Sequence, residues 1–442
     1  MNSHQVLSVL AAALVVTSGR LLAQHDAHRP LAGVPLRIPE GRIGSGTAWL
    51  PDSTAHRMSR FARGAWTFDL HGAVTAHYVS QGTKRGATEF GITDWEMLSA
   101  SRTLAGGLLR LRAMTSFEPI SLGGSGYALL LQTGGTWRHS PLRDRQHPHN
   151  AIVEASAAFE RALGSDAALS VYVAPVGEPA LGPVSYRHRP SAKADPTAPL
   201  GLHWQDASHQ SFGVVTAGLY GRTVRLEGSA FNAREPDEAY PVMDFRGARL
   251  DSYSGRISWA PNGRLVASGW WGFLGAHSRL DLTTRMHRYG AALLSETRGP
   301  GGGRLASALI WGVNVHHHGA ASHAVIHGGA NGSPHQKSSS VLLESTLGLG
   351  RATSLFTRVE RVEKNGEELG FLGGDLSVLY DVRALALGIS RRVAAVRGTE
   401  LALGVRGTLN LVPQSLEATY GTRRPTGVVA FMQFGPGASR DP

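Results

Sequence analysis

The sequence predicts an all-β protein: a transmembrane antiparallel β-barrel of about sixteen strands, within a range of roughly 14 to 18. Three observations support this fold class. Apolar and polar residues alternate over many short segments, the connections between these segments alternate between short and long, and no run approaches the roughly 18 consecutive apolar residues of a membrane-spanning helix. Alternation at this period places one side of each strand against lipid and the other toward a polar interior.

Residues 401–411 show the pattern most clearly. Leu401, Leu403 and Val405 occupy alternate positions, and the positions between them carry small or polar residues such as Arg406. Successive side chains of a strand point to opposite faces, so this segment would present one apolar face and one polar face. One such strand could also lie at the surface of a soluble sheet, and the repetition of the pattern decides for a barrel.

The same alternation recurs along the chain from residue 66 onward. It predicts strands at 66–79, 89–101, 107–117, 151–160, 167–174, 212–220, 224–231 and 253–259. Weaker alternation predicts further strands at 265–275, 284–296, 304–316, 338–348, 353–363 and 376–392, and the last two at 400–411 and 427–434.

The connections support the same fold independently. Tight turns are predicted at 105–106, 164–166, 221–222, 261–263 and 350–351, and long segments at about 120–149, 176–210 and 233–249. An even-stranded barrel has short periplasmic turns and long extracellular loops, so both chain termini are expected in the periplasm.

The ends of the chain carry a different composition. The apolar run 6–16 and the small residue Ala23 predict a secretory signal peptide over 1–23. Residues 24–64 are expected to form a leader that is either disordered, the interpretation we favour, or tucked into the barrel through Trp49, Leu50 and Pro51. The barrel would span 65–435, followed by a short tail over 436–442.

Composition and motifs exclude several function classes. The chain has no cysteine, which excludes a thiolate metal site and a cysteine nucleophile. Its formal net charge is +11, but the arginines are dispersed along strands and loops, so no nucleic-acid partner is expected. No G-x-S-x-G, H-E-x-x-H or glycine-rich phosphate motif occurs, and no enzyme is predicted, with a barrel hydrolase kept as the minor alternative.

The expected location is the bacterial outer membrane, with outer-membrane lipid and the barrel-assembly machinery as partners.

Charged residues on the polar faces of the strands are the candidate pore lining. They are Asp69, Arg110, Arg112, Arg225, Glu227, Arg256 and Arg406. The excess of arginine favours a slight anion preference. The alternative is that these charges pair with one another and have no transport role. The segment 174–210 contains six prolines, so we expect an ordered loop that folds inward and narrows the lumen, or else caps the mouth from outside.

Histidine is the other candidate for function, with 20 residues concentrated in the leader and the long loops. An ordered loop site is proposed at His147, His149, Glu178, His188, His203 and His209. His316, His317 and His318 are candidates for weak Cu or Zn binding, because neutral imidazole is a common ligand of both metals. The alternatives are loop-anchoring hydrogen bonds for the first group and no role for the second. No other cofactor is expected.

Four stretches carry a resemblance to a known family. They are 144–149 (DRQHPH), 177–183 (GEPALGP), 200–204 (LGLHW) and 416–421 (LEATYG). With them the chain resembles a porin-like family of bacterial outer-membrane β-barrels over most of its length after residue 45. The resemblance implies the barrel already argued; it lends no established activity, and its association with heavy-metal handling is loose.

Together these observations predict an outer-membrane channel for small solutes or ions, with slight anion preference and a lumen narrowed by an ordered loop. The alternatives are a non-conducting adhesion or structural barrel, and a metal-binding surface protein with histidine-rich loops.

Overall fold

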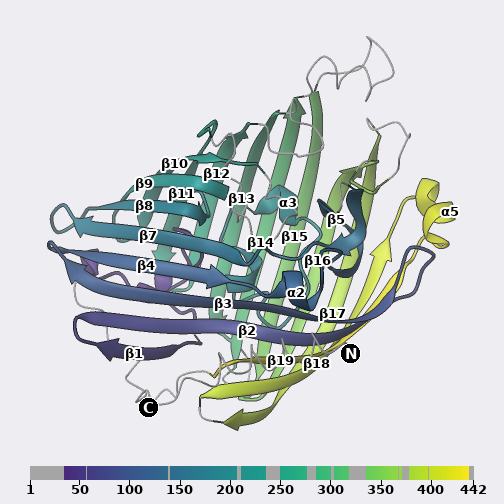
Figure 1. The fold of residues 1–442 in the computed structure, drawn as a ribbon, viewed down its shortest axis with the longest axis horizontal. Helices are drawn as coiled ribbons and strands as arrows, with labels where there is room; N and C mark the ends of the chain where they lie inside the picture. The colour runs from purple at the N-terminus through teal and green to yellow at the C-terminus, as the bar shows by residue number, and fades with distance from the viewer. Residues whose placement is uncertain are drawn as a thin grey trace.

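A computed structural model of the protein describes residues 34–55, 57–137, 140–206, 211–234, 249–275, 285–299, 303–317, 335–366, 368–370, 378–396 and 398–437. Sixteen antiparallel strands form a closed barrel, as the sequence predicts. Figure 1 shows the strands as a ring around short helical segments. Among the described residues, no helix is long and apolar enough to cross a lipid bilayer.

The wall strands follow one another in chain order. They are β2 (Trp66–Gln81), β3 (Thr88–Leu104), β4 (Gly107–Thr115), β7 (Ile152–Ala162), β8 (Ala168–Gly177), β9 (Ser211–Tyr220), β10 (Val224–Asn232), β11 (Ser252–Asn262), β12 (Leu265–Leu274), β13 (Arg285–Arg298), β14 (Arg304–His317), β15 (His335–Leu349), β16 (Thr353–Asn365), β17 (Leu379–Val396), β18 (Thr399–Leu411) and β19 (Thr426–Pro436). The last strand pairs with the first, from Gly427 opposite Gln81 to Phe434 opposite Val74. This seam leaves no open sheet edge along the paired length, which a membrane-spanning sheet requires.

The two faces of the wall differ as the alternation predicts. Leu226 and Ile257 expose 52% and 50% of their surface on the outside, whereas their neighbours Arg225 and Arg256 expose 1% and 5%. In β18, Leu403 is 47% exposed and Arg406 is 3% exposed. The apolar face therefore points outward, and the polar face points into the lumen.

Three strands were not predicted. β1 (Ser59–Arg63) pairs with the first five residues of β2, and β5 (Tyr127–Trp137) pairs with β6 (Ser140–Gln146) as a separate two-stranded sheet in a region expected to be a loop. The pairing of β5 with β6 skips residues at two places, so this hairpin lacks the regular alternation that would have revealed it.

The predicted tight turn at 105–106 is present between β3 and β4. Ala105 and Gly106 both have positive φ, 48° and 73°, as the two central residues of a type I′ hairpin turn do. Such a turn matches the right-handed twist of the flanking strands, which explains why two residues suffice here.

The N-terminal segment, residues 34–55, lies inside the barrel. It contains two single-turn helices, η1 (Pro35–Arg37) and η2 (Glu40–Arg42), and its Trp49 and Leu50 are each 2% exposed. Trp49 packs edge-on against Tyr220 of β9, with ring centroids 6.3 Å apart. Of the two positions considered for the leader, residues 34–55 occupy the lumen, and residues 24–33 lie outside the described residues. The predicted signal peptide and most of the predicted tail lie outside the described residues.

Candidate functional site

A long connection between β8 and β9, residues 178–206, lies in the lumen, and we call it the lumen loop. It includes the short helices η3 (Tyr186–His188) and α3 (Leu202–Gln205). The Trp204 indole is 1% exposed and donates a hydrogen bond of 2.8 Å to the hydroxyl of Ser338 on β15. At Gly312 of β14, an added Cβ would come within 2.2 Å of the Trp204 carbonyl oxygen. The loop therefore lies directly on the inner wall, and glycine is needed where the two backbones meet.

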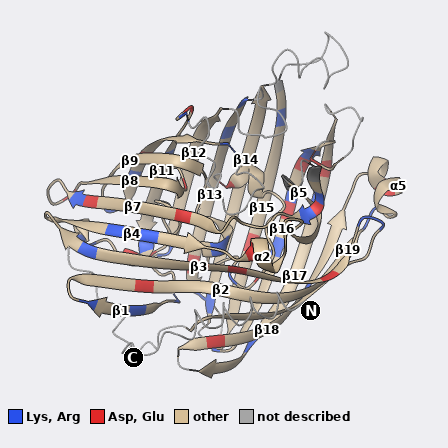
Figure 2. Cartoon of the chain, viewed as in Figure 1, with Lys and Arg blue, Asp and Glu red and all other residues tan. Residues whose placement is uncertain are grey.

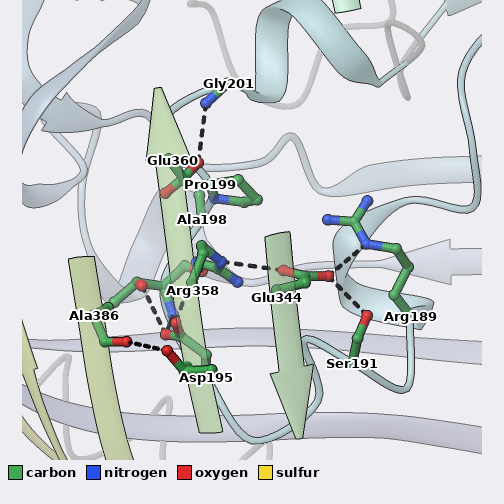
Figure 3. A network of polar contacts seen from close by, with 12 residues as sticks. Arg189, Ser191, Asp195, Ala198, Pro199, Gly201, Glu344, Arg358, Glu360 and Ala386 are labelled. Carbon is green, nitrogen blue, oxygen red and sulfur yellow. Dashed lines mark hydrogen bonds and ion pairs between the residues drawn. The ribbon is translucent and has the colours of Figure 1, made fainter. Parts of the chain in front are cut away.

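Buried charges join the middle of the lumen loop to the wall (Figure 3). Glu344 of β15 accepts hydrogen bonds from Arg189 Nε at 2.8 Å and from Ser191 Oγ at 2.9 Å. Its second carboxylate oxygen accepts from Arg358 Nε of β16 at 3.1 Å. One carboxylate thus connects the loop to two neighbouring strands.

The same network continues through Asp195 of the loop. Asp195 Oδ2 lies 3.2 Å from Arg358 Nη1 and 3.1 Å from Arg406 Nε of β18. Burial alone would raise the pKa of Asp195, but the two guanidinium groups outweigh it, and the pKa is lowered. We call Arg189, Glu344, Arg358, Asp195 and Arg406 the arginine network. Its carboxylates accept hydrogen bonds from buried guanidinium groups, which is the condition under which buried ion pairs are stable.

The N-terminal segment packs between the wall and the lumen loop. Arg112 of β4 donates to the Gly44 carbonyl at 3.3 Å, and Arg256 of β11 donates to Thr47 Oγ1 at 2.9 Å. The Ser185 amide of the loop donates to Ser45 Oγ at 2.8 Å. Polar groups of the segment, the loop and the wall satisfy one another, so the three parts form one packed interior.

At the end of the N-terminal segment, the chain crosses the end of the barrel that carries the short turn between β11 and β12. The Ser53 amide donates to the Gly263 carbonyl in the turn between β11 and β12 at 2.8 Å. Farther along, Arg57 Nη1 lies 2.7 Å from Glu400 Oε2 of β18. These two contacts attach the crossing at both ends.

Every predicted pore-lining charge points inward and has a partner of opposite sign. The pairs are Asp69 with Arg60 (2.6 Å), Arg110 with Glu40 (4.0 Å), Arg112 with Glu154 (2.8 Å), Arg225 with Glu227 (2.8 Å), Arg256 with Glu227 (2.9 Å) and Arg406 with Asp195 (3.1 Å). Figure 2 shows basic residues on β4 beside acidic residues on β7. This arrangement matches the alternative in which lumen charges pair, and it reduces the positive potential that the arginines would otherwise create.

Three of the predicted histidines come together in the structure. The ring centroid of His147 lies 6.0 Å from that of His149 and 5.9 Å from that of His203. His149 Nδ1 contacts Glu118 Oε2 at 2.7 Å, and Arg187 Nη2 contacts Glu118 Oε1 at 2.5 Å. We call these five residues the histidine cluster. It attaches the start of the lumen loop to α2 (Glu118–Ser121).

The protonation states of the histidine cluster follow from burial and charge. Burial lowers the pKa of His147 to about 4, and it also lowers the pKa of His149, with Arg187 adding to the shift. Burial would raise the pKa of Glu118, but Arg187 and His149 outweigh it and the pKa falls below its usual range. At neutral pH His147 and His149 are therefore neutral and Glu118 is ionised.

The sequence did not indicate Glu118 or Arg187. They lie 69 positions apart, and neither belongs to a motif. The arrangement of His147, Pro148 and His149 beside a charged stretch was the only signal near this site.

The other predicted loop-site residues lie elsewhere. The His188 ring packs against Trp95 and His71, with centroids 4.8 Å and 5.8 Å away. Glu178 lies beside Gly46 of the N-terminal segment, and burial raises its pKa to about 8. His209 lies outside the described residues. The predicted loop site is therefore split into separate packing environments.

The metal candidates are only partly described. His316 and His317 end β14, and the His317 ring lies 5.1 Å from that of His287 on β13; His318 is outside the described residues. Among the residues placed in the structure, no three His, Cys, Asp or Glu side chains are arranged to hold a metal ion. Copper or zinc binding by this region stays a prediction.

No family model and no curated protein sequence matches the chain. Solved structures do match. The Salmonella typhi OmpF complex with daunomycin superposes with a TM-score of 0.51 at 8% identity, covering 85% of this chain and 100% of that one. The anion-selective porin from Comamonas acidovorans has a TM-score of 0.47 at 12% identity, covering 84% and 99% of the two chains. The outer-membrane channel DcaP of Acinetobacter baumannii has a TM-score of 0.45 at 10% identity, covering 85% and 98%. The first likeness shows a shared porin-like barrel fold, which implies an outer-membrane protein.

Proposed function

We propose that this protein is an outer-membrane channel for small solutes or ions, narrowed by the lumen loop and the N-terminal segment, with a slight preference for anions. The fold is that of a pore-forming barrel. The observation that carries the finer proposal is the arginine network, because it fixes residues 189–195 against β15, β16 and β18 on the lumen side. The proposal assigns no catalytic activity.

The size of the barrel supports a passage. A wall of about sixteen strands encloses more space than its own side chains can fill. Part of this space is occupied: the cavity between Gly46, Arg112 and Arg225 has a volume of about 10 Å³.

The proposal places outer-membrane lipid around the apolar outer face, and it leaves insertion to the barrel-assembly machinery.

The anion preference should be slight because the inward arginines are paired. A guanidinium beside a carboxylate contributes little field at a distance of several ångströms, particularly in salt.

Conductance in a planar bilayer tests the channel. Replacing residues 186–204 by a short Gly-Ser linker should raise single-channel conductance by about twofold or more, because the loop occupies lumen volume. A matched control is Arg361→Gln on the outer wall, where the side chain is 41% exposed and far from the loop contacts, and conductance should not change.

Two outcomes would reject the proposal in different ways. A loop that caps the mouth from outside would leave conductance unchanged after the deletion. Absence of conductance in both the intact and the shortened protein, with both shown to be folded by their heat-modifiable mobility on gels, would favour the adhesion or structural barrel.

A further inference from the structure

The β5–β6 hairpin fills part of the lumen. Leu131 of β5 is 0% exposed and belongs to one apolar cluster with Val362 of β16. The ring of Tyr127, at the start of β5, lies 5.0 Å from that of His77 on β2. Because β17, β18 and β19 separate β16 from β2, these two contacts are about 19 Å apart along the wall. The hairpin therefore lies across the inner face of the wall from β16 to β2.

Asp144 of β6 attaches the hairpin to neighbouring connections. It is 4% exposed, and its Oδ2 lies 2.5 Å from Nε of Arg85 in the β2–β3 connection. Its Oδ1 accepts hydrogen bonds from the Tyr420 hydroxyl in the β18–β19 connection at 3.1 Å and from the Leu131 amide of β5 at 2.6 Å. We call Asp144, Arg85 and Tyr420 the latch. One carboxylate thus joins both strands of the hairpin to two connections at the same end of the barrel.

Two residues of the hairpin have a backbone conformation that their side chains disfavour. Leu131 has a φ of 65° and Asp144 a φ of 49°, in the left-handed region that a leucine rarely adopts. Both lie where the pairing of β5 with β6 is interrupted. Such conformations persist only where surrounding contacts compensate for them. The latch supplies these contacts, because its carboxylate also accepts the Leu131 amide.

The chain that enters the hairpin has the properties of a hinge. Residues 123–126 read Gly-Gly-Ser-Gly, and Gly123 and Gly126 have positive φ, 69° and 62°. Glycine adopts such angles without strain, so this stretch can change conformation at low cost. The base of the hairpin is attached separately, because Arg145 Nη2 lies 3.1 Å from Glu89 Oε2 of β3. The hairpin thus combines an attached base, a glycine hinge and a latch.

We infer that the β5–β6 hairpin is the movable gate of the channel and that the latch holds it closed. This inference rests on the channel function proposed above. The lumen loop is instead fixed by the arginine network, whose ion pairs run directly to wall strands. Release of the latch removes the contacts that compensate for the strain at Leu131. The hairpin should then turn about residues 123–126 and uncover the inner face of the wall from β16 to β2.

The absence of cysteine from the chain allows this movement to be measured by thiol reactivity. Ala384 of β17 is 6% exposed and belongs to the cluster of Leu131, so Ala384→Cys places a thiol under the hairpin. Its thiolate attacks a negatively charged methanethiosulfonate, forming a mixed disulfide and releasing methanesulfinate. The matched control is Ala292→Cys on β13, at a residue that is 5% exposed and belongs to the cluster of Leu50 in the N-terminal segment.

Loss of the latch should speed the reaction at residue 384 only. Asp144→Ala should raise the rate in Ala384→Cys by about tenfold, since it removes an ion pair and two hydrogen bonds. Tyr420→Phe removes one hydroxyl, keeps the ring and should raise the rate by about threefold. Both changes together should react no faster than Asp144→Ala alone, because the hydroxyl acts through the carboxylate.

A matched control for the latch is Glu417→Ala, at an exposed carboxylate in the same connection as Tyr420, which should leave the rate unchanged. Heat-modifiable mobility on gels shows that each variant is folded. Equal rates at residue 384 in all folded variants, or an equal rise at residue 292, would overturn the inference whether or not the barrel conducts.

Single-channel recording tests the gate itself. Asp144→Ala should raise the fraction of time spent open by about tenfold and leave the conductance of the open state unchanged, because the lumen loop stays in place. Normal currents with an unchanged open fraction would overturn the gate and leave the channel intact. No current in wild type or in any variant, together with faster reaction at residue 384, would reject the channel while establishing that the hairpin moves.

Discussion

The lumen loop is attached to the barrel at two places that differ in chemistry. At the arginine network, guanidinium groups face carboxylates, and neither partner changes charge near neutral pH. At the histidine cluster, neutral His147 and His149 lie beside Arg187 and Glu118, and the balance of charge depends on protonation. The first attachment should therefore be permanent, and the second should weaken in acid.

The arginine network offers the largest effect. Glu344→Ala would leave Arg189 and Arg358, each with a side chain 1% exposed, without their shared carboxylate. Removing one partner of a buried ion pair typically costs about 3–5 kcal/mol. The variant should unfold at clearly lower denaturant concentration, measured by gel mobility. The control is Glu363→Ala, whose side chain is 26% exposed on the outer wall; equal losses in the two variants would contradict the special role of the network.

Acid should act on the histidine cluster instead. The pKa of His147 is lowered to about 4 in the folded protein, against about 6.5 unfolded, so the unfolded chain binds more protons between these values. Stability should consequently decrease as the pH falls from about 6.5 to about 4, by at most about 3 kcal/mol. His147→Gln should flatten the stability curve in this window, and an equally steep curve in that variant would assign the pH dependence to other groups.

Glu118 extends the acid sensitivity to lower pH. Its folded pKa is depressed, so the stability it contributes is present above its unfolded pKa of about 4.3 and is lost as the pH falls further. Two successive losses are therefore expected at this attachment, and neither is expected at the arginine network.

The smallest effect on stability is expected at residues 53–57, where the chain crosses the end of the barrel. The Arg57 side chain is 41% exposed, and ion pairs of this kind typically contribute about 0–1 kcal/mol. Arg57→Ala should leave the unfolding midpoint nearly unchanged but loosen the crossing under the lumen, which fluctuations in single-channel current would report. A large loss of stability would show that the crossing is a third structural attachment, comparable to the other two.

The fold could be read from the sequence because a strand in a barrel obeys a local rule. Alternation in 224–231 and 253–259 places Arg225 and Arg256 inward without any knowledge of their neighbours. The inward direction of all seven candidate charges followed from this rule. Their pairing did not, because partners such as Asp195 for Arg406 come from a loop 211 positions away.

The positions of the segments that fill the lumen were harder to predict from the sequence for the same reason. Nothing in the sequence distinguishes Asp195 from the other charged residues of a proline-rich loop; its contacts with Arg358 and Arg406 depend on which part of the wall the loop packs against. The N-terminal segment was equally ambiguous, since Trp49 and Leu50 only suggest burial and the polar groups that bind the segment belong to β4 and β11.

The seam of the barrel has a consequence for the order of assembly. The wall closes where β19, the last strand in the sequence, pairs with β2, the first strand of the wall. The N-terminal segment, the β5–β6 hairpin and the lumen loop are all synthesised before β19, and all three end up enclosed. These three segments are therefore synthesised before the barrel can close, and the pairing of β19 with β2 then encloses them. Without β19, the sheet should stay open, and the three segments should remain accessible to solvent.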